Sequence, residues 1–132
     1  MQDATTAAAG RFLMATLFIM SGLSKIAAPT AVIGTIAAAG LPFPALSYVI
    51  ALVVEIGGGL LLLAGFRARM AAMVLAAFTI VAAVAFHRDF ADQNQLIHFL
   101  KNVAITGGLL QVVAFGAGRF SIDARRALHQ QG

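Results

Sequence analysis

The sequence has no cysteine and no tryptophan, and it is poor in proline and in charge. Of its 132 residues, 11% are charged and 61% are hydrophobic, whereas soluble domains average about 25% and 45–50%. The absence of cysteine excludes disulfides, thiolate-bound metals, iron–sulfur ligation and any dithiol relay carried by this chain. The low charge excludes an ordinary water-soluble globule, because so many apolar side chains must face lipid or other helices. We therefore expect one compact membrane domain.

The few charges are spread thinly along the chain. Nine Lys and Arg against five Asp and Glu give a net charge of +4. The basic residues stand singly between apolar stretches and form no basic stripe with interleaved aromatic residues, so nucleic acid is not an expected partner. The expected partner is the lipid bilayer.

Four apolar stretches are long enough to cross a hydrocarbon core of about 30 Å. They cover residues 12–28, 46–66, 70–86 and 97–115. Backbone groups cannot stay unpaired in lipid, and no alternating strand pattern is present, so each stretch is predicted to be a helix. The expected fold is an all-α membrane protein, a bundle of four transmembrane helices.

The first stretch is the weakest of the four, because Ser21, Ser24 and Lys25 interrupt it. A short apolar core of this kind also fits a signal peptide. We favour a retained span, since residues 2–6 before it carry no positive charge, which a signal peptide would have there.

The segment 30–46, between the first two stretches, is too apolar for an exposed loop. Val32, Ile33 and Ile36 follow helical spacing, and the Leu-Pro-Phe-Pro sequence at 41–44 forces an extended break. We predict a short interfacial or re-entrant helix here that covers one end of the bundle.

Basic residues predict the orientation. If the amino terminus is cytoplasmic, one side collects six of them and the other side collects Lys25, Arg88 and Lys101. The six are Arg11, Arg67, Arg69, Arg119, Arg125 and Arg126. The positive-inside rule then places both termini in the cytoplasm, with 116–132 as a basic cytoplasmic tail.

The most informative residues are ionisable groups inside the spans, because each is costly unless it finds a partner, water or the bundle interior. Glu55 lies about 13 Å from the outer end of the second span, near the midplane. Lys25 and Lys101 lie about 6 Å from the outer ends of their spans, within reach of that carboxylate. A Lys–Glu–Lys cluster in the outer half of the bundle is geometrically available.

Further polar residues converge on the same half. Ser21 shares a helix face with Lys25, and His98 shares one with Lys101 and Asn102. His87, at the end of the third span, completes the set of candidate ligand or proton residues. These seven are Ser21, Lys25, Glu55, His87, His98, Lys101 and Asn102. Two interpretations stay open: a ligand or proton site, or a buried ion pair that holds the helices in register.

The histidines are too few and too exposed in position to predict a haem or metal site. His87 and His98 could be axial ligands on facing helices, but both lie at the water boundary, where histidine commonly caps a helix, so haem is not expected. With three histidines in all, no metal site is predicted. No Walker loop, dinucleotide fingerprint or hydrolase elbow is present, and no catalytic residue is assigned.

The order of these motifs resembles the DoxX family of small bacterial membrane proteins. The resemblance rests on Ser21-Gly22-Leu23-Ser24-Lys25, Leu41-Pro42, Glu55-Ile56-Gly57-Gly58-Gly59, Arg69, Phe99-Leu100-Lys101-Asn102, Gly107-Gly108-Leu109-Leu110 and the end 116–123. It implies a four-helix protein of the bacterial inner membrane, related to the DoxD-type subunit of thiosulfate:quinone oxidoreductase. Some relatives are linked to thiol-redox or oxidative-stress complexes. Because this chain has no cysteine, any thiol exchange belongs to a partner.

Three functions follow as hypotheses. The first is a quinone-linked accessory subunit of a membrane redox complex, in which the polar cluster binds or protonates a quinone oxygen. The second is a non-catalytic structural or assembly subunit that uses its glycine-rich helix faces to dock a protein partner or a second copy. The third is a small transporter subunit, which the size of a single bundle disfavours.

Overall fold

The computed structural model describes residues 2–132, and within them every regular element is a helix. The helices are α1 (Gln2–Ala27), α2 (Pro29–Ala38), α3 (Pro44–Leu52), the π-helical segment η1 (Val53–Gly57), α4 (Gly58–Ala64), α5 (Ala68–Phe86), α6 (Gln93–Phe115) and α7 (Ile122–His129). Because α3, η1 and α4 form one uninterrupted run, 4 helices are long and apolar enough to cross a membrane. The predicted all-α bundle with a shorter apolar helix between the first two spans is confirmed.

The helices extend beyond the apolar stretches. α1 begins near residue 2 rather than 12, because the alanine-rich start of the chain favours helix even where it is polar. α6 begins at Gln93, where the carboxylate of Asp92 accepts hydrogen bonds from the amides of Asn94 at 2.8 Å and Gln95 at 3.3 Å. Hydropathy marks the lipid-facing part of a helix, whereas capping residues decide where the helix ends.

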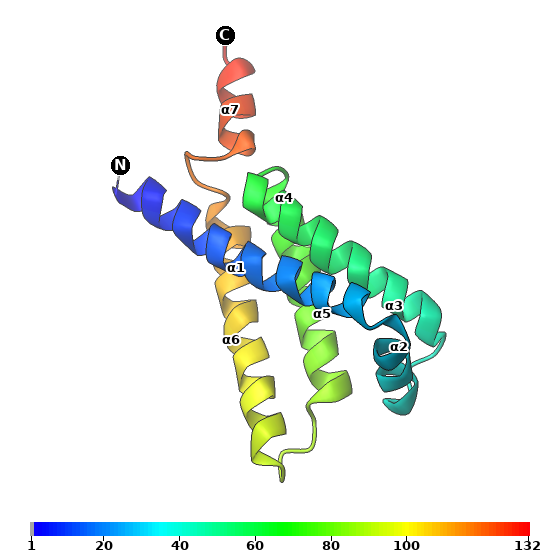
Figure 1. Ribbon diagram of the computed structural model, residues 1–132. Coiled ribbons are helices and arrows are strands. Elements are labelled where there is room, and N and C mark those ends of the chain that lie inside the picture. The colour runs from blue at the N-terminus through cyan, green and yellow to red at the C-terminus, as the bar shows by residue number, and fades with distance from the viewer. Residues whose placement is uncertain (1) are drawn as a thin grey trace.

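Two helix pairs build the bundle (Figure 1). α1 packs on the continuous α3–η1–α4 helix, α5 packs on α6, and contacts between α4 and α5 join the pairs. Small side chains let the helices approach: Ala15, Ala68 and Ala72 are fully buried, and Leu62, Leu75 and Leu109 fill the centre. At Gly59 an added Cβ would lie 2.9 Å from Cγ1 of Ile19, so this glycine sets the separation of α1 and α4.

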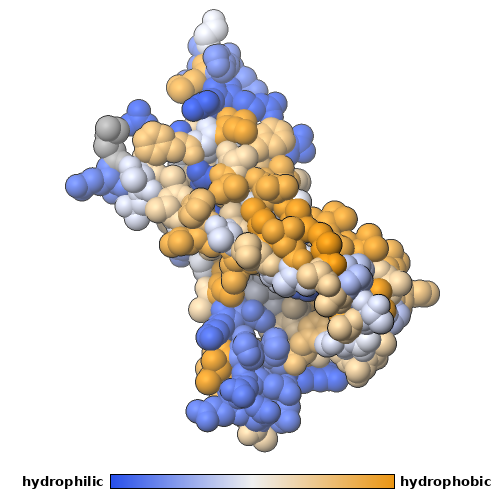
Figure 2. All heavy atoms as spheres, viewed as in Figure 1, coloured by the Kyte–Doolittle hydropathy of each residue, from blue (hydrophilic) through white to orange (hydrophobic). Residues whose placement is uncertain are grey.

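The two ends of the bundle differ. One end, called here the terminal end, carries both chain termini and the turn between α4 and α5; the other, the hairpin end, carries the turn between α5 and α6 (Figure 1). The surface is hydrophilic at the hairpin end and at α7, and hydrophobic over the body between them (Figure 2). This is the pattern expected for a membrane-spanning body whose two ends are exposed to water. Which end faces the cytoplasm stays a prediction.

Residues 116–132 contain more structure than a basic tail. Ser121 caps α7, accepting a hydrogen bond from the amide of Ala124. Asp123 of α7 accepts hydrogen bonds from the amides of Arg67 and Ala68 at 2.8 and 2.9 Å, so α7 in turn caps α5. The tail is therefore bound back onto the bundle.

Arg11 of α1 holds the terminal end together from inside. Its guanidinium is buried and donates hydrogen bonds to the carbonyls of Leu62 and Leu63 at the end of α4, and of Ala117 and Phe120 after α6. The sequence placed Arg11 at the span boundary as a topology signal. The structure shows that it also joins α1 to the end of α4 and to the linker between α6 and α7 through these hydrogen bonds.

Candidate functional site

Glu55 lies in the π-helical segment η1, near the middle of the 21-residue run Pro44–Ala64. A π-helical turn holds one more residue than an α-helical turn and changes the direction in which the following side chains point. Such turns inside α-helices occur frequently at functional sites. The side chain of Glu55 is directed toward α1 and is 4% exposed.

Ser21, Lys25 and Glu55 form a compact polar triad. The hydroxyl of Ser21 donates to Oε1 of Glu55 at 2.8 Å, and Nζ of Lys25 donates to the same Oε1 at 3.0 Å and to Oγ of Ser21 at 2.9 Å. Nζ also lies 2.9 Å from Oε2 in an ion pair, the one salt bridge found within residues 2–132. The four-residue spacing of Ser21 and Lys25 on α1 brings both groups to a single carboxylate.

The two oxygens of Glu55 are not equivalent. Oε1 accepts two hydrogen bonds, whereas the buried Oε2 has only the ion-pair contact and no hydrogen bond within the described chain. An unsatisfied buried acceptor is costly in a protein interior. Nζ of Lys25 lies within 3.0 Å of three acceptors, so its three N–H groups are already matched within the triad, whereas Oε2 retains a lone pair that no hydrogen bond within the described residues occupies.

The triad borders a cavity of about 890 Å³ between the two helix pairs. The cavity wall is mainly apolar and comes from α1, α2, α3, η1, α5 and α6. Figure 2 shows the surface hollowed between the α1–α2 side and the α5–α6 hairpin. The polar lining residues are Ser21, Lys25, Thr35, Ser47, Glu55, Thr79, His87 and Asn102. Leu17, Ile50 and Val81 line the cavity and are also exposed, so the cavity is bordered by apolar side chains of three of the four long helices where it reaches the surface.

The short helix α2 closes this cavity at the hairpin end. Val32, Thr35 and Ile36 contribute to the wall, and Ile36 is buried. The break at 41–44 reverses the chain through Phe43, whose φ of 49° is left-handed, before Pro44 begins α3. The covering helix that the sequence predicts is thus present.

The structure brings together five of the seven predicted site residues. Ser21, Lys25, Glu55, His87 and Asn102 all line the cavity. Lys101 and His98 do not line it; both are exposed on α6. The Lys–Glu–Lys cluster therefore does not form, and Glu55 pairs with Lys25 alone. The depth of a residue along a helix can be counted from sequence. The direction of its side chain around the helix axis cannot, because neighbouring residues differ by about 100°.

His87, which follows α5 and lines the cavity, stacks on His98 of α6. Their rings stack with centroids 5.0 Å apart and an interplanar angle of 29°. Burial lowers the pKa of His87 below its ordinary value, and the neighbouring His98 lowers it further. Rings stacked on each other cannot ligate a haem iron from its opposite faces. Within residues 2–132 no group of three or more potential metal ligands is found.

Several further polar residues at the site were not predicted: Thr35, Ser47 and Thr79 in the cavity wall, and Tyr48 beside it. Thr79 is buried in the cavity wall, and its hydroxyl donates to the carbonyl of Leu75 at 2.7 Å. Tyr48 donates from its hydroxyl to the carbonyl of Lys25 at 3.1 Å, which holds the end of α1 against α3. Thr79 could have been noticed as the one hydroxyl in an otherwise apolar stretch, whereas Tyr48 carries no such signal.

Comparisons with known proteins agree with the fold. The DoxX family pattern matches residues 6–88. The inner membrane protein YqjF of Escherichia coli K12 is 41% identical over 113 residues, which is 86% of this chain and 85% of YqjF. The inner membrane protein YphA of the same organism is 31% identical over 121 residues, covering 87% of this chain and 86% of YphA. No solved structure matches the chain.

Proposed function

This chain belongs to the DoxX family of integral inner-membrane proteins, and from that premise we propose that it is a quinone-linked accessory subunit of a membrane redox complex. The bundle holds the quinone headgroup in its lateral cavity and manages the protons of its reduction. The electrons come from a redox-active partner subunit, because the chain has no cysteine and no self-sufficient catalytic motif.

One observation carries the proposal: a buried charged triad stands on the wall of a mainly apolar cavity, which apolar side chains border where it reaches the surface. A quinone has the matching chemistry, with a flat apolar ring and tail and carbonyl oxygens at the ring edge. Ligand cavities of this size with a few convergent polar groups are typical of small-molecule sites. Lipid-soluble ligands also need a lateral opening rather than an aqueous one.

The spare hydrogen-bonding capacity of the triad fits both redox forms of the ligand. The ammonium of Lys25 can donate to a quinone carbonyl by exchanging one of its contacts within the triad, and the second lone pair of Oε2 of Glu55 can accept from a quinol hydroxyl. Full reduction of a quinone consumes two electrons and two protons. In this proposal Glu55 and Lys25 exchange those protons, and His87, the lining residue that follows α5, relays them.

The test is quinone binding by the purified chain in nanodiscs that contain a ubiquinone or menaquinone, measured as ligand retained per protein. Ser21→Ala keeps the ion pair and should weaken binding modestly. Glu55→Gln and Lys25→Gln should each weaken it about tenfold, which corresponds to about 1.4 kcal/mol.

Lys101→Gln is the matched control, because it makes the same chemical change at an exposed position outside the cavity. It should bind quinone like the wild-type chain. Unchanged binding in Glu55→Gln, or an equal loss in Lys101→Gln, would contradict the proposal.

A second function is favoured by a different observation. The most apolar part of α6 is only 11% buried within the molecule, less than in the other three long helices, which leaves a wide face for a protein partner or a second copy. In a purely structural or assembly subunit, the triad would act as a pin between α1 and η1. Glu55→Gln would then lower thermal stability and the yield of the complex together, whereas the quinone proposal expects a folded variant with lost ligand.

A further inference from the structure

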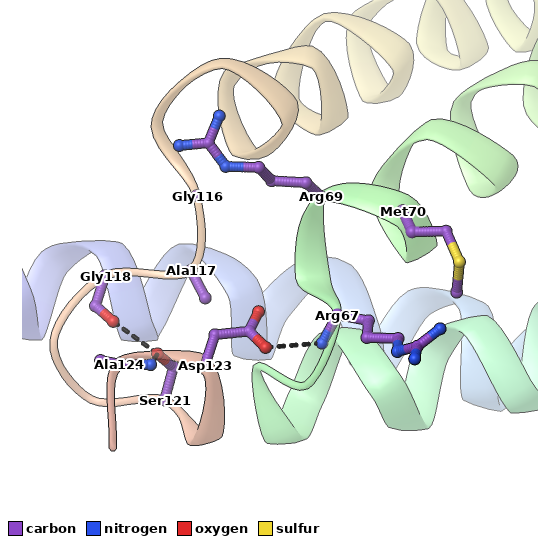
Figure 3. Close-up of a pocket in the computed structure, with 9 residues that line it drawn as sticks. All are labelled: Arg67, Arg69, Met70, Gly116, Ala117, Gly118, Ser121, Asp123 and Ala124. Atoms are coloured by element: carbon purple, nitrogen blue, oxygen red, sulfur yellow. Dashed lines mark hydrogen bonds between the residues drawn. The ribbon is translucent and has the colours of Figure 1, made fainter. Parts of the chain in front are cut away.

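A second pocket, of about 570 Å³, lies at the terminal end of the bundle, away from the triad. It is formed by the start of α5, the linker after α6 and the start of α7 (Figure 3). Its charged lining residues are Arg67, Arg69 and Asp123. Because it lies where the long helices end, it is at the depth of the lipid headgroups rather than of the acyl chains.

Arg69 presents an unused hydrogen-bonding edge in this pocket. Its Nη1 donates to the carbonyls of Val113 and Ala114 at 3.1 Å each, at the end of α6. Its Nε and Nη2 have no acceptor within the described residues. Both atoms lie beside Gly116, where an added Cβ would be 3.4 Å from each of them, and Figure 3 shows the guanidinium beside this linker. The Nε–Nη2 edge is the one that binds phosphate or carboxylate through two parallel hydrogen bonds.

The surroundings of Arg69 are cationic. The guanidinium groups of Arg67 and Arg126 lie over the ring of Phe66, 6.0 and 5.3 Å from its centroid, and neither is in an ion pair within residues 2–132. Asp123 is the acidic group of the pocket, and both of its oxygens already accept hydrogen bonds from the amides of Arg67 and Ala68. Two arginines and one engaged carboxylate line the pocket, so its net charge is positive.

Exposed apolar side chains adjoin the pocket. Met70 lines it and is 48% exposed, and Phe115, next to Gly116 in the chain, is 79% exposed. A soluble anion would make no favourable contact with these apolar side chains, whereas the acyl chains of a lipid would cover them. Basic pockets at the ends of transmembrane helices recognise anionic lipid headgroups by this combination of charge and apolar surface.

We propose that this pocket binds the phosphate of an anionic glycerophospholipid, with the free edge of Arg69 as the bidentate ligand and Arg67 as a supporting cation. The lipid fastens the α6–α7 linker and the start of α5 to the headgroup layer. This assignment does not depend on the quinone site, which lies in the other cavity.

The test is native mass spectrometry of the delipidated protein in detergent, titrated separately with phosphatidylglycerol and phosphatidylcholine of the same acyl chains. The wild-type chain should retain phosphatidylglycerol about fivefold more tightly, since one basic residue near an anionic headgroup contributes about 1 kcal/mol. Arg69→Gln should remove most of that preference and leave phosphatidylcholine binding unchanged. The side chain of Arg67 makes no hydrogen bond within residues 2–132, so Arg67→Gln should reduce the preference without disturbing the fold.

Arg88→Gln is the control, because it removes one exposed arginine at the hairpin end, and it should behave like the wild type. Equal retention of the two lipids, or an unaltered preference in both Arg67→Gln and Arg69→Gln, overturns the proposal. Displacement of phosphatidylglycerol by equimolar glycerol 3-phosphate also overturns it, since the ligand would then be a soluble phosphate.

Discussion

Lys25 and Glu55 are joined across the interface between α1 and η1, with Nζ of the lysine within 3.0 Å of both carboxylate oxygens. The lysine side chain is one quarter exposed and lies on the cavity wall, whereas the glutamate is almost fully buried. The pair therefore connects the interior of the bundle to the cavity. A ligand that enters laterally meets the ammonium and carboxylate together, which is what a site for proton exchange requires.

Gly22 allows α1 to approach the triad, and we predict that an alanine there disturbs it. A Cβ at this position would overlap Cγ1 of Ile56 and lie 3.6 Å from Cβ of Glu55. Gly22→Ala should therefore lower stability by about 1–3 kcal/mol through overpacking, seen as a lower Tm, and should weaken quinone binding.

Gly10→Ala is the matched change on the same helix, where an added Cβ meets nothing within 4 Å. It should leave ligand binding intact and raise stability slightly, because alanine favours helix over glycine by about 1 kcal/mol. Equal effects of the two substitutions would show that packing at Gly22 does not control the site.

Replacement of Arg11 should destabilise the terminal end strongly. Arg11→Ala removes the donor to four carbonyls of α4 and the α6–α7 linker, of which Leu62 still accepts from the amide of Gly65, and each buried acceptor left unpaired costs about 1–3 kcal/mol. Arg11→Lys keeps the charge but cannot reproduce the fork of donors, so it should recover only part of the loss. Thermal unfolding followed by circular dichroism measures both; a lysine variant as stable as the wild type would show that charge alone matters.

Asp123 should stabilise α5 from a distance of more than fifty residues in sequence. Asp123→Ala removes the acceptors of the Arg67 and Ala68 amides and should cost about 1 kcal/mol, the typical value of a helix cap. Hydrogen exchange at these two amides should accelerate. Asp89→Ala, at an exposed position in the other turn, should leave their exchange unchanged.

The lowered pKa of His87 predicts that the stability of the folded chain depends on pH. Its pKa in the folded chain is below the ordinary 6.5 because of burial and His98. As the pH falls through about 6.5, the unfolded chain takes up the proton first, so the free energy of unfolding decreases until the folded-state pKa is passed. Tm measured from pH 8 to pH 5 should fall less in His87→Gln than in the wild type, and parallel curves would contradict the assignment.

The absence of cysteine makes the predicted orientation directly testable. Gln131→Cys, beyond α7, should resist a membrane-impermeant maleimide in intact cells and react after the membrane is opened, if the termini are cytoplasmic. Ala91→Cys, in the exposed turn between α5 and α6, should react in intact cells. The reverse pattern would invert the topology.

Much of the fold could be predicted because the bilayer imposes it. Apolar length requires helices in lipid, and the proline-containing break at 41–44 requires an interruption before the second long helix. The midplane depth of Glu55 and the reach of Lys25 also followed from sequence, since a charge at that depth must find a partner, whereas the structure alone shows that Lys25 forms the ion pair. Lys101 does not line the cavity with Glu55, because the direction of its side chain depends on how α6 packs against the other helices.

The sequence by itself therefore determined the membrane class, the helices, the covering segment and the residues that cannot face lipid. All of these depend on local length, spacing and the cost of burying a charge. The tertiary structure alone decided which polar side chains share a cavity, that Arg11 gathers carbonyls from two distant segments, and that Asp123 caps α5. These relationships depend on the rotation of each helix and on contacts between residues far apart in the chain, for which the amino-acid sequence carries no local signal.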